Sequence, residues 1–175
     1  MLIRVTEPYQ PAGGGRQRQR PTGKTGYVEN VKHSNHFVPT KSSIVPRTYI
    51  FPAELAGVAE KLREHGIEVK TIGTKIKVSG EEFFISKFSQ SQREGYGGHK
   101  AVTLEGDFRT VKKTIPTGSF YVDLAQPLAW LIFYLLEPQS DDGLVYWNYF
   151  DDYLLKNGVD KGPVAYPVIK TTQEL

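Results

Sequence analysis

Two different spacings of apolar residues alternate along the chain, and the change from one to the other predicts the elements. Four apolar residues recur on one face of a helix: Leu55, Val58, Ala59 and Leu62. Pro52 suits the first turn of this helix, and Gly66 supplies the left-handed residue that ends it. Short strands are expected at residues 47–51 and 67–72. The pattern therefore predicts a strand–helix–strand unit.

A series of short strands is expected after residue 72. They are predicted at residues 75–78, 83–88, 100–104, 110–115 and 119–122. Gly80, Gly106-Asp107 and residues 116–118 are interpreted as the breaks between them, and residues 89–98 as a polar, glycine-rich loop. This succession is typical of a β-meander.

Two helices are expected towards the end of the chain. Residues 127–136 are apolar on nearly every side, which predicts a helix buried between the sheet and a second helix at residues 144–155. The same helix could instead be the docking face for another domain, with one side exposed. Residues 159–175 show no regular period and are interpreted as an irregular tail.

The first part of the chain has no apolar period. Residues 8–26 are rich in Gly, Pro, Gln and Arg and offer little surface to a core. We therefore expect a flexible basic arm at residues 1–36, one α+β domain at 37–158 and the tail at 159–175. Its sheet is expected to be mixed but largely antiparallel, with the strand–helix–strand unit and the two C-terminal helices packed on it.

The composition excludes several kinds of site and segment, but it does not indicate a function. The chain has 175 residues, 39% of them apolar, a net charge of +3 and no cysteine, so disulfides and thiolate metal sites are excluded. Its first residues lack the apolar run of a secretory signal, and the longest apolar run, residues 128–136, is too short to span a bilayer. We expect a soluble chain. Its compartment is left open.

Contact with nucleic acid is not favoured. Arg16, Arg18, Arg20 and Lys24 make the arm basic and could contact phosphates, but a solvated linker is the favoured interpretation of these charges. Gly23-Lys24-Thr25 resembles the end of a phosphate-binding loop. That motif needs a glycine where Arg18 stands, so it is rejected.

The histidines do not assemble into a metal site. His65 and Glu68 have the spacing of a zinc-binding pair, but a third ligand is missing and His65 falls at a helix end. His33 and His36 form at most half of a site. We expect no metal, no cofactor and no catalytic residue in this chain.

Aromatic and acidic residues concentrate between Gly118 and Asp152. Aromatic residues at this density belong to a core more often than to a stacking platform. Asp141-Asp142-Gly143 is typical of a turn that caps a helix. His99 lies in a glycine-rich loop that could carry it to a ligand. The candidate binding residues are His99, Tyr121, Gln126, Asp141, Asp142, Trp147 and Asn148.

Four blocks covering about residues 37–153 resemble the C-terminal region that follows the catalytic domain in large bacterial zinc carboxypeptidases of the carboxypeptidase A superfamily. The blocks are 37–40 with 46–52; 62–69, LREHGIEV; Gly98-His99 with 115–119; and 125–127, 136–138, 140–143 and 147–151. The last block is the most specific, because it is long and unlike common helix sequences.

The resemblance implies an accessory role. In that family the zinc ligands and the catalytic glutamate lie in an upstream domain, so none of them is transferred to this chain. The expected partner is then a peptidase domain of a parent protein that could be secreted or periplasmic, and a peptide or cell-wall glycan could be presented to it. Two alternatives stay open: an independent carbohydrate- or peptidoglycan-binding module that uses the C-terminal aromatic residues, and a small hydrolase that uses the His99 loop and the acidic edge.

Overall fold

The computed structural model describes the chain except for residues 1, 12–16, 30–35, 37 and 40. It divides into two compact units, Met1–Ser42 and Ser43–Leu175. Among the sequence candidates, Arg16, His33 and the expected domain start at Phe37 lie outside the described residues.

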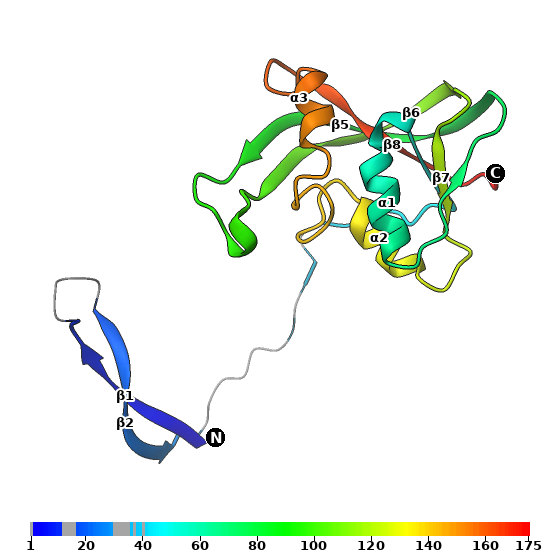
Figure 1. The fold of residues 1–175 in the computed structure, drawn as a ribbon. Helices are drawn as coiled ribbons and strands as arrows, with labels where there is room; N and C mark the ends of the chain where they lie inside the picture. Colours follow the sequence, from blue (N-terminus) through cyan, green and yellow to red (C-terminus); the bar gives the residue numbers. More distant parts are fainter. Residues whose placement is uncertain (1, 12–16, 30–35, 37, 40) are drawn as a thin grey trace. The chain divides into compact units, whose positions relative to one another are not determined.

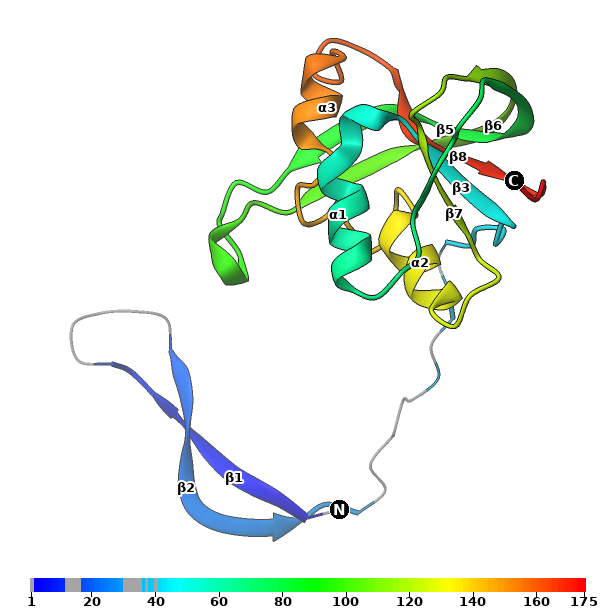
Figure 2. The same ribbon diagram turned by 45° about the vertical axis from the view of Figure 1, so that its right-hand side comes forward.

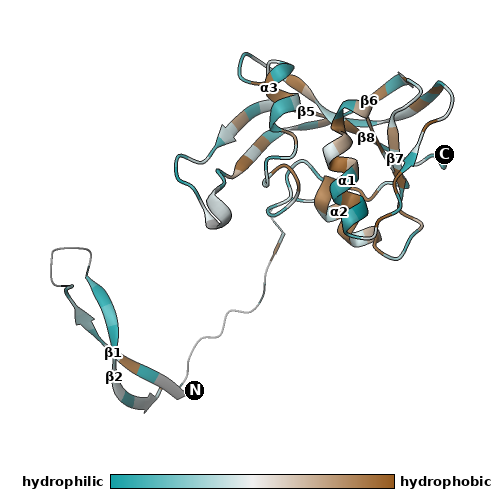
Figure 3. Ribbon diagram, viewed as in Figure 1, coloured by the Kyte–Doolittle hydropathy of each residue, from teal (hydrophilic) through white to brown (hydrophobic). Residues whose placement is uncertain are grey.

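The first unit contains a hairpin where an arm without regular structure was expected. β1 (Leu2–Tyr9) pairs antiparallel with β2 (Arg18–Tyr27), and Glu7 stands opposite Arg20 (Figure 1). Every residue of β2 is exposed or partly exposed, and its colours in Figure 3 are largely hydrophilic. Backbone pairing makes this hairpin, and the side chains of β2 bury almost no apolar surface. That is why a search for apolar periods overlooks it.

The second unit is built on a six-stranded sheet. Its strands are β3 (Thr48–Phe51), β4 (Lys70–Thr71), β5 (Ile76–Gln90), β6 (Val102–Ile115), β7 (Phe120–Asp123) and β8 (Val164–Thr171). Their order across the sheet is β4-β7-β3-β8-β5-β6, and each pairing is antiparallel. The α+β class expected from the sequence is confirmed. The sheet expected to be mixed is antiparallel throughout the described residues.

The strand–helix–strand unit is also confirmed. After β3, the short 3-10 turn η1 (Ala53–Leu55) leads into α1 (Ala56–Glu64). Val58, Ala59 and Leu62 are buried on the inner face of α1. The chain leaves the helix at Gly66, whose φ of 81° is the left-handed conformation expected there.

Gly80 and Gly106 do not separate strands, because each lies inside one long strand of the β5–β6 hairpin (Figure 2). A Cβ atom on Gly80 would overlap the carbonyl oxygen of Lys170, and one on Gly106 would overlap that of Phe84. Both glycines therefore permit close approach of a neighbouring backbone, a use that sequence cannot distinguish from a turn.

The segment expected to be an irregular tail contains β8, which lies in the sheet between β3 and β5. Its residues from Tyr166 to Thr171 are all buried. A strand buried on both faces shows no alternation of apolar and polar residues, so the segment lacks the period by which strands were predicted. Pro167 is accommodated at the register shift between β8 and β5. The domain thus extends to the end of the chain.

Helices cover one face of this sheet (Figures 1 and 2). α1 and α2 (Ala129–Leu136) pack against strand residues such as Tyr49, Phe51 and Phe83, and α3 (Asp151–Lys156) adds Leu154. A smaller apolar cluster gathers separately from this core: Ile50, Ile72, Val78, Ile115 and Ile169. Within the described residues, every helix is too short or too polar to cross a bilayer.

Two expectations for the C-terminal helices are wrong. α2 is largely apolar in colour in Figure 3, but it is not buried all round: Trp130 is 75% exposed and Tyr134 is 41% exposed. The helix expected at 144–155 begins only at Asp151, after a series of turns. Asn148 interrupts it, because its φ of 68° is outside the right-handed helical region.

Candidate functional site

The sequence candidates His99, Asp142, Trp147 and Asn148 come together where the loop before β6 meets the turns before α3. The indole Nε1 of Trp147 donates a hydrogen bond of 2.6 Å to Asp142 Oδ1. The His99 ring stacks on Trp147 with centroids 4.2 Å apart, and it meets Tyr146 edge-on at 5.4 Å. Trp147 is thereby fixed in one orientation while 38% of it stays exposed.

A second exposed aromatic pair continues from this tryptophan along α2. The Tyr134 hydroxyl donates a 2.7 Å hydrogen bond to Asp141 Oδ1, next to the aspartate that holds Trp147. This bond, more than burial, raises the pKa of Tyr134. Trp130 lies one helical turn before Tyr134, so the two share a face of α2. We call Trp130, Tyr134, Asp141, Asp142 and Trp147 the aromatic–acidic surface.

Asn148 joins the two segments behind this surface. Its Nδ2 donates hydrogen bonds of 2.9 Å to the carbonyl oxygen of Lys100 and to Asp151 Oδ2. Asparagine is among the few residues that tolerate a positive φ, so the position combines a backbone and a side-chain requirement. Burial raises the pKa of Asp151, which the hydrogen bond from Asn148 partly offsets.

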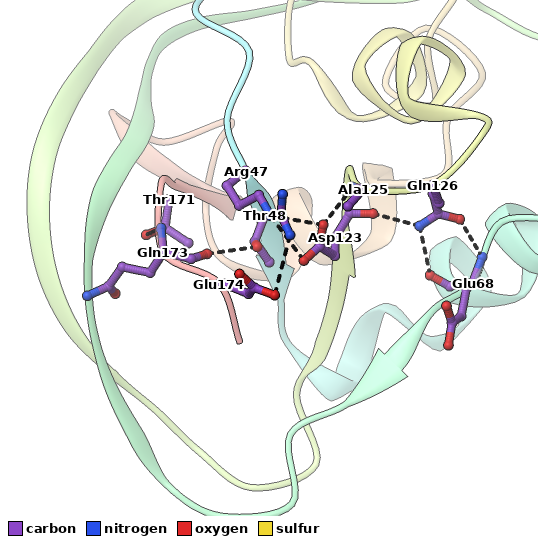
Figure 4. A network of polar contacts seen from close by, with 9 residues as sticks. All are labelled: Arg47, Thr48, Glu68, Asp123, Ala125, Gln126, Thr171, Gln173 and Glu174. Atoms are coloured by element: carbon purple, nitrogen blue, oxygen red, sulfur yellow. Dashed lines mark hydrogen bonds and ion pairs between the residues drawn. The ribbon is translucent and has the colours of Figure 1, made fainter.

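The remaining two candidates lie elsewhere and have structural contacts. Gln126 clamps the loop after α1: its Oε1 accepts from the Glu68 N–H at 2.9 Å, and its Nε2 donates to the Asp123 carbonyl oxygen at 2.7 Å (Figure 4). Tyr121 is partly buried against the smaller apolar cluster. Asp123 also pairs through its side chain with Arg47, at 3.2 Å. Neither candidate belongs to the aromatic–acidic surface.

The residues with zinc-like spacing have other partners. His65 Nδ1 lies 2.9 Å from the Lys61 carbonyl oxygen at the end of α1, and Glu68 pairs with Lys70 at 3.4 Å. His36 is exposed. Among the described residues, no group of three or more His, Asp or Glu side chains could hold a metal ion.

A buried polar network escaped the sequence analysis. Glu137 Oε1 accepts a 2.6 Å hydrogen bond from the Tyr49 hydroxyl and lies 3.1 Å from Lys170 Nζ. Ser43 Oγ donates to Glu137 Oε2 and accepts from Lys170 Nζ, both at 2.6 Å. Lys170 Nζ also lies 4.1 Å from the centre of the Phe108 ring. With each of these contacts made, the network stabilises the fold and leaves Ser43 poorly suited to act as a nucleophile.

Only a weak signal in the sequence could have revealed this network. Glu137 directly follows the most apolar helix, and Lys170 directly follows the apolar run at residues 164–169, which are unusual places for charges that are buried. Their pairing joins the end of α2 to β8, more than thirty residues later in the sequence.

Comparisons of this chain with models of protein families, with curated proteins and with solved structures return no match.

Proposed function

We propose that this chain is a non-catalytic accessory domain that docks on a partner protein domain through the aromatic–acidic surface. The observation that carries the proposal is the exposure of Trp130, at 75%, on a helix whose inner face is part of the core. Tyr134 and Trp147 extend this exposed aromatic area. Tryptophan and tyrosine dominate the energetic centres of protein interfaces, and exposed aromatic groups of this kind mark such interfaces.

The charge of the surface indicates what the partner presents. Asp141 and Asp142 lie between the aromatic side chains, so the partner would offer apolar pockets beside basic groups. The resemblance of residues 37–153 to the region downstream of zinc carboxypeptidases points to a peptidase domain as that partner. This identity rests on the resemblance alone. The proposal assigns no metal, cofactor or catalytic residue to the chain.

A carbohydrate- or peptidoglycan-binding module is the second candidate. It is favoured by the fixed orientation of Trp147, which has the Asp142 carboxylate and the Asn148 amide as polar neighbours. His99 covers one face of the indole, so a sugar ring would have to stack on the other. The hydrolase alternative gains no support, because the ring contacts of His99 are with Trp147 and Tyr146.

The test is complex formation between the full chain and the catalytic domain of a zinc carboxypeptidase that carries such a region. We expect an equimolar complex by light scattering after gel filtration, lost in the double variant W130S/Y134S. Leu155→Ser is the matched control, because Leu155 is an exposed apolar residue on α3, outside this surface. Absence of a complex, or equal binding by the double variant, would contradict docking through this surface.

Soluble peptidoglycan fragments are titrated in parallel. Binding that is lost in Trp147→Ala, without complex formation with the peptidase domain, would replace the docking role with the glycan-binding one.

A further inference from the structure

A second feature of the domain lies apart from the aromatic–acidic surface: a buried carboxylate beside a small hollow. Glu82, on β5, lines a hollow of about 180 Å³, and its side chain is only 4% exposed. Lys113 Nζ on β6 lies 2.5 Å from Glu82 Oε1. Lys113 is 43% exposed, so this ion pair extends from the surface inward.

The second oxygen of this carboxylate is unusual. Oε2 of Glu82 is buried and accepts no hydrogen bond within the described part of the chain. Arg109 is the residue opposite Glu82 on β6, but its guanidinium lies 4.5 Å from the centre of the Phe84 ring. Buried carboxylate oxygens are satisfied in nearly all native proteins, and an unsatisfied one calls for an explanation. A donor bound in the hollow would satisfy this oxygen.

The walls of the hollow indicate the kind of donor. Apolar side chains form much of it, among them Ile50, Pro52, Pro116 and Pro167. Tyr153 adds an aromatic ring on the side of α3. The volume of the hollow, about 180 Å³, exceeds the volume of roughly 150 Å³ of a cavity that is known to hold a benzene molecule. A small molecule with an apolar body therefore fits.

The charges favour a cation. Burial raises the pKa of the Tyr153 hydroxyl first, and the negative charges of Glu54 and Glu82 raise it further, so both carboxylates act on this region. Lys113 compensates one of them. Glu82 and Lys113 are the charged residues that line the hollow, and the Glu54 carboxylate acts on it from outside. An ammonium group would be attracted by both carboxylates and, in addition, by the face of Tyr153.

We propose that the hollow beside Glu82 is a binding site for a small organic ammonium with an apolar body, held by the Glu82 carboxylate. The ammonium donates a hydrogen bond to the second carboxylate oxygen, and the apolar body lies against the proline and isoleucine side chains. Such a group occurs on free alkylamines and on peptide N-termini alike.

The test compares three probes of similar shape by amide chemical-shift changes in the full chain: butylammonium, butanol and butyrate. We expect butylammonium to bind with a dissociation constant on the order of 1 mM, the range that suits so small a ligand. Butanol should bind at least about tenfold more weakly, because it makes no charge-assisted hydrogen bond. Shifts should be centred on Glu82, Thr114 and Tyr153. Equal binding of butanol, or no shifts in this region, would overturn the proposal.

Substitutions sharpen the test. Glu82→Gln keeps the shape and should weaken butylammonium binding by about tenfold or more. Glu81→Gln, the neighbouring carboxylate on the same strand, is the matched control and should leave binding unchanged. Lys113→Met removes the competing cation and should strengthen binding, which a purely structural ion pair would not produce. Unchanged affinity in Glu82→Gln would refute the proposal.

Leucinamide presents the same ammonium as a peptide N-terminus. Tighter binding of leucinamide than of butylammonium would assign the site to peptide ends, and the reverse order would assign it to free amines. The wild-type probe series does not depend on any variant folding correctly.

Discussion

At the scale of single residues, the fold depends on two buried charges, those of Glu137 and Lys170. Glu137 and Lys170 are 6% and 4% exposed, and their mutual contact would not suffice without the hydroxyls of Tyr49 and Ser43. A buried ion pair gains stability only where additional hydrogen bonds satisfy its remaining atoms. Each member is therefore sensitive to substitution.

Tyr49→Phe should lower the free energy of unfolding by about 1–3 kcal/mol at neutral pH, because a buried carboxylate loses one donor. Burial, and then the negative charge of Glu137, raise the pKa of Tyr49 from its ordinary 10.0. The folded chain thus holds this proton more tightly than the unfolded chain. The contribution of Tyr49 to stability should be constant below pH 10 and fall above it, by about 1.4 kcal/mol per pH unit for each such tyrosine.

Urea unfolding between pH 8 and 11, at steps of about half a unit, measures both effects. The alkaline decline should be shallower in Tyr49→Phe and should not vanish, because burial also raises the pKa of Tyr166. Tyr121→Phe, outside the network, serves as the control. An unchanged stability and an unchanged alkaline slope in Tyr49→Phe would show that the hydrogen bond to Glu137 contributes nothing.

Gly80→Ala should destabilise the domain by about 1–3 kcal/mol, as overpacking does, because its new Cβ atom would overlap the Lys170 carbonyl oxygen. Gly57→Ala is the counterpart: it lies in α1 with no atom within 4 Å of its added Cβ, and it should stabilise by about 0.5–1 kcal/mol. Thermal unfolding of both variants checks the pair. Equal effects of the same sign would mean that the close approach of β8 to β5 is not a constraint.

At the scale of elements, α2 joins two surfaces with different roles. Ile132, Leu135 and Leu136 face the core, whereas Trp130 and Tyr134 face outwards. The helix α2 therefore carries large apolar side chains on its exposed side as well as on the side that faces the core. The docking face that the sequence left open as an alternative fits this arrangement better than complete burial does.

Ile132→Ala should cost about 2–5 kcal/mol, since Ile132 is fully buried and its truncation leaves a cavity. Leu131→Ala should cost less, because Leu131 is only partly buried. Trp130→Ala should change stability by no more than about 0.5 kcal/mol. Chemical denaturation of the three variants gives the order, and a Trp130→Ala cost equal to that of Ile132→Ala would place Trp130 inside the core.

At the scale of the whole molecule, the two units differ in what holds them together. The hairpin of residues 1–42 has backbone pairing and an exposed ion pair between Arg20 and Glu7, at 2.6 Å. The unit of residues 43–175 has a continuous apolar core. Two-stranded hairpins of the first kind are marginally stable by themselves.

A fragment of residues 42–175 should keep its thermal midpoint within about 5 °C of the full chain, a difference of roughly 1 kcal/mol. Starting the fragment at Ile44 should lower the midpoint, because Ser43 and its hydrogen bond to Glu137 are lost. Ending it at Gly162 should abolish folding, because β8 is removed from the middle of the sheet. A large loss in the first fragment would show that residues 1–41 contribute to the core.

Local patterns were sufficient for α1 and for the turn that ends it. The spacing of Leu55, Val58, Ala59 and Leu62 predicted α1, and Gly66 its end, because helix periodicity and the left-handed residue after it are properties of a short segment. The α+β class followed from such segments. The sequence also singled out His99, by its glycine-rich loop, and Trp147 with its acidic neighbours, by the local concentration of aromatic and acidic residues.

Only the tertiary structure decided the rest. Whether Gly80 is a turn or a point of close approach depends on β8, which lies about ninety residues away in the sequence. Whether Trp130 is core or surface depends on which side of α2 meets the sheet. The contacts of Glu82 and Glu137 join different strands and loops. The sequence by itself therefore determined the local elements and the fold class, whereas long-range backbone pairing decided which residues are brought together, because apolar periodicity carries no information about the partner of a strand.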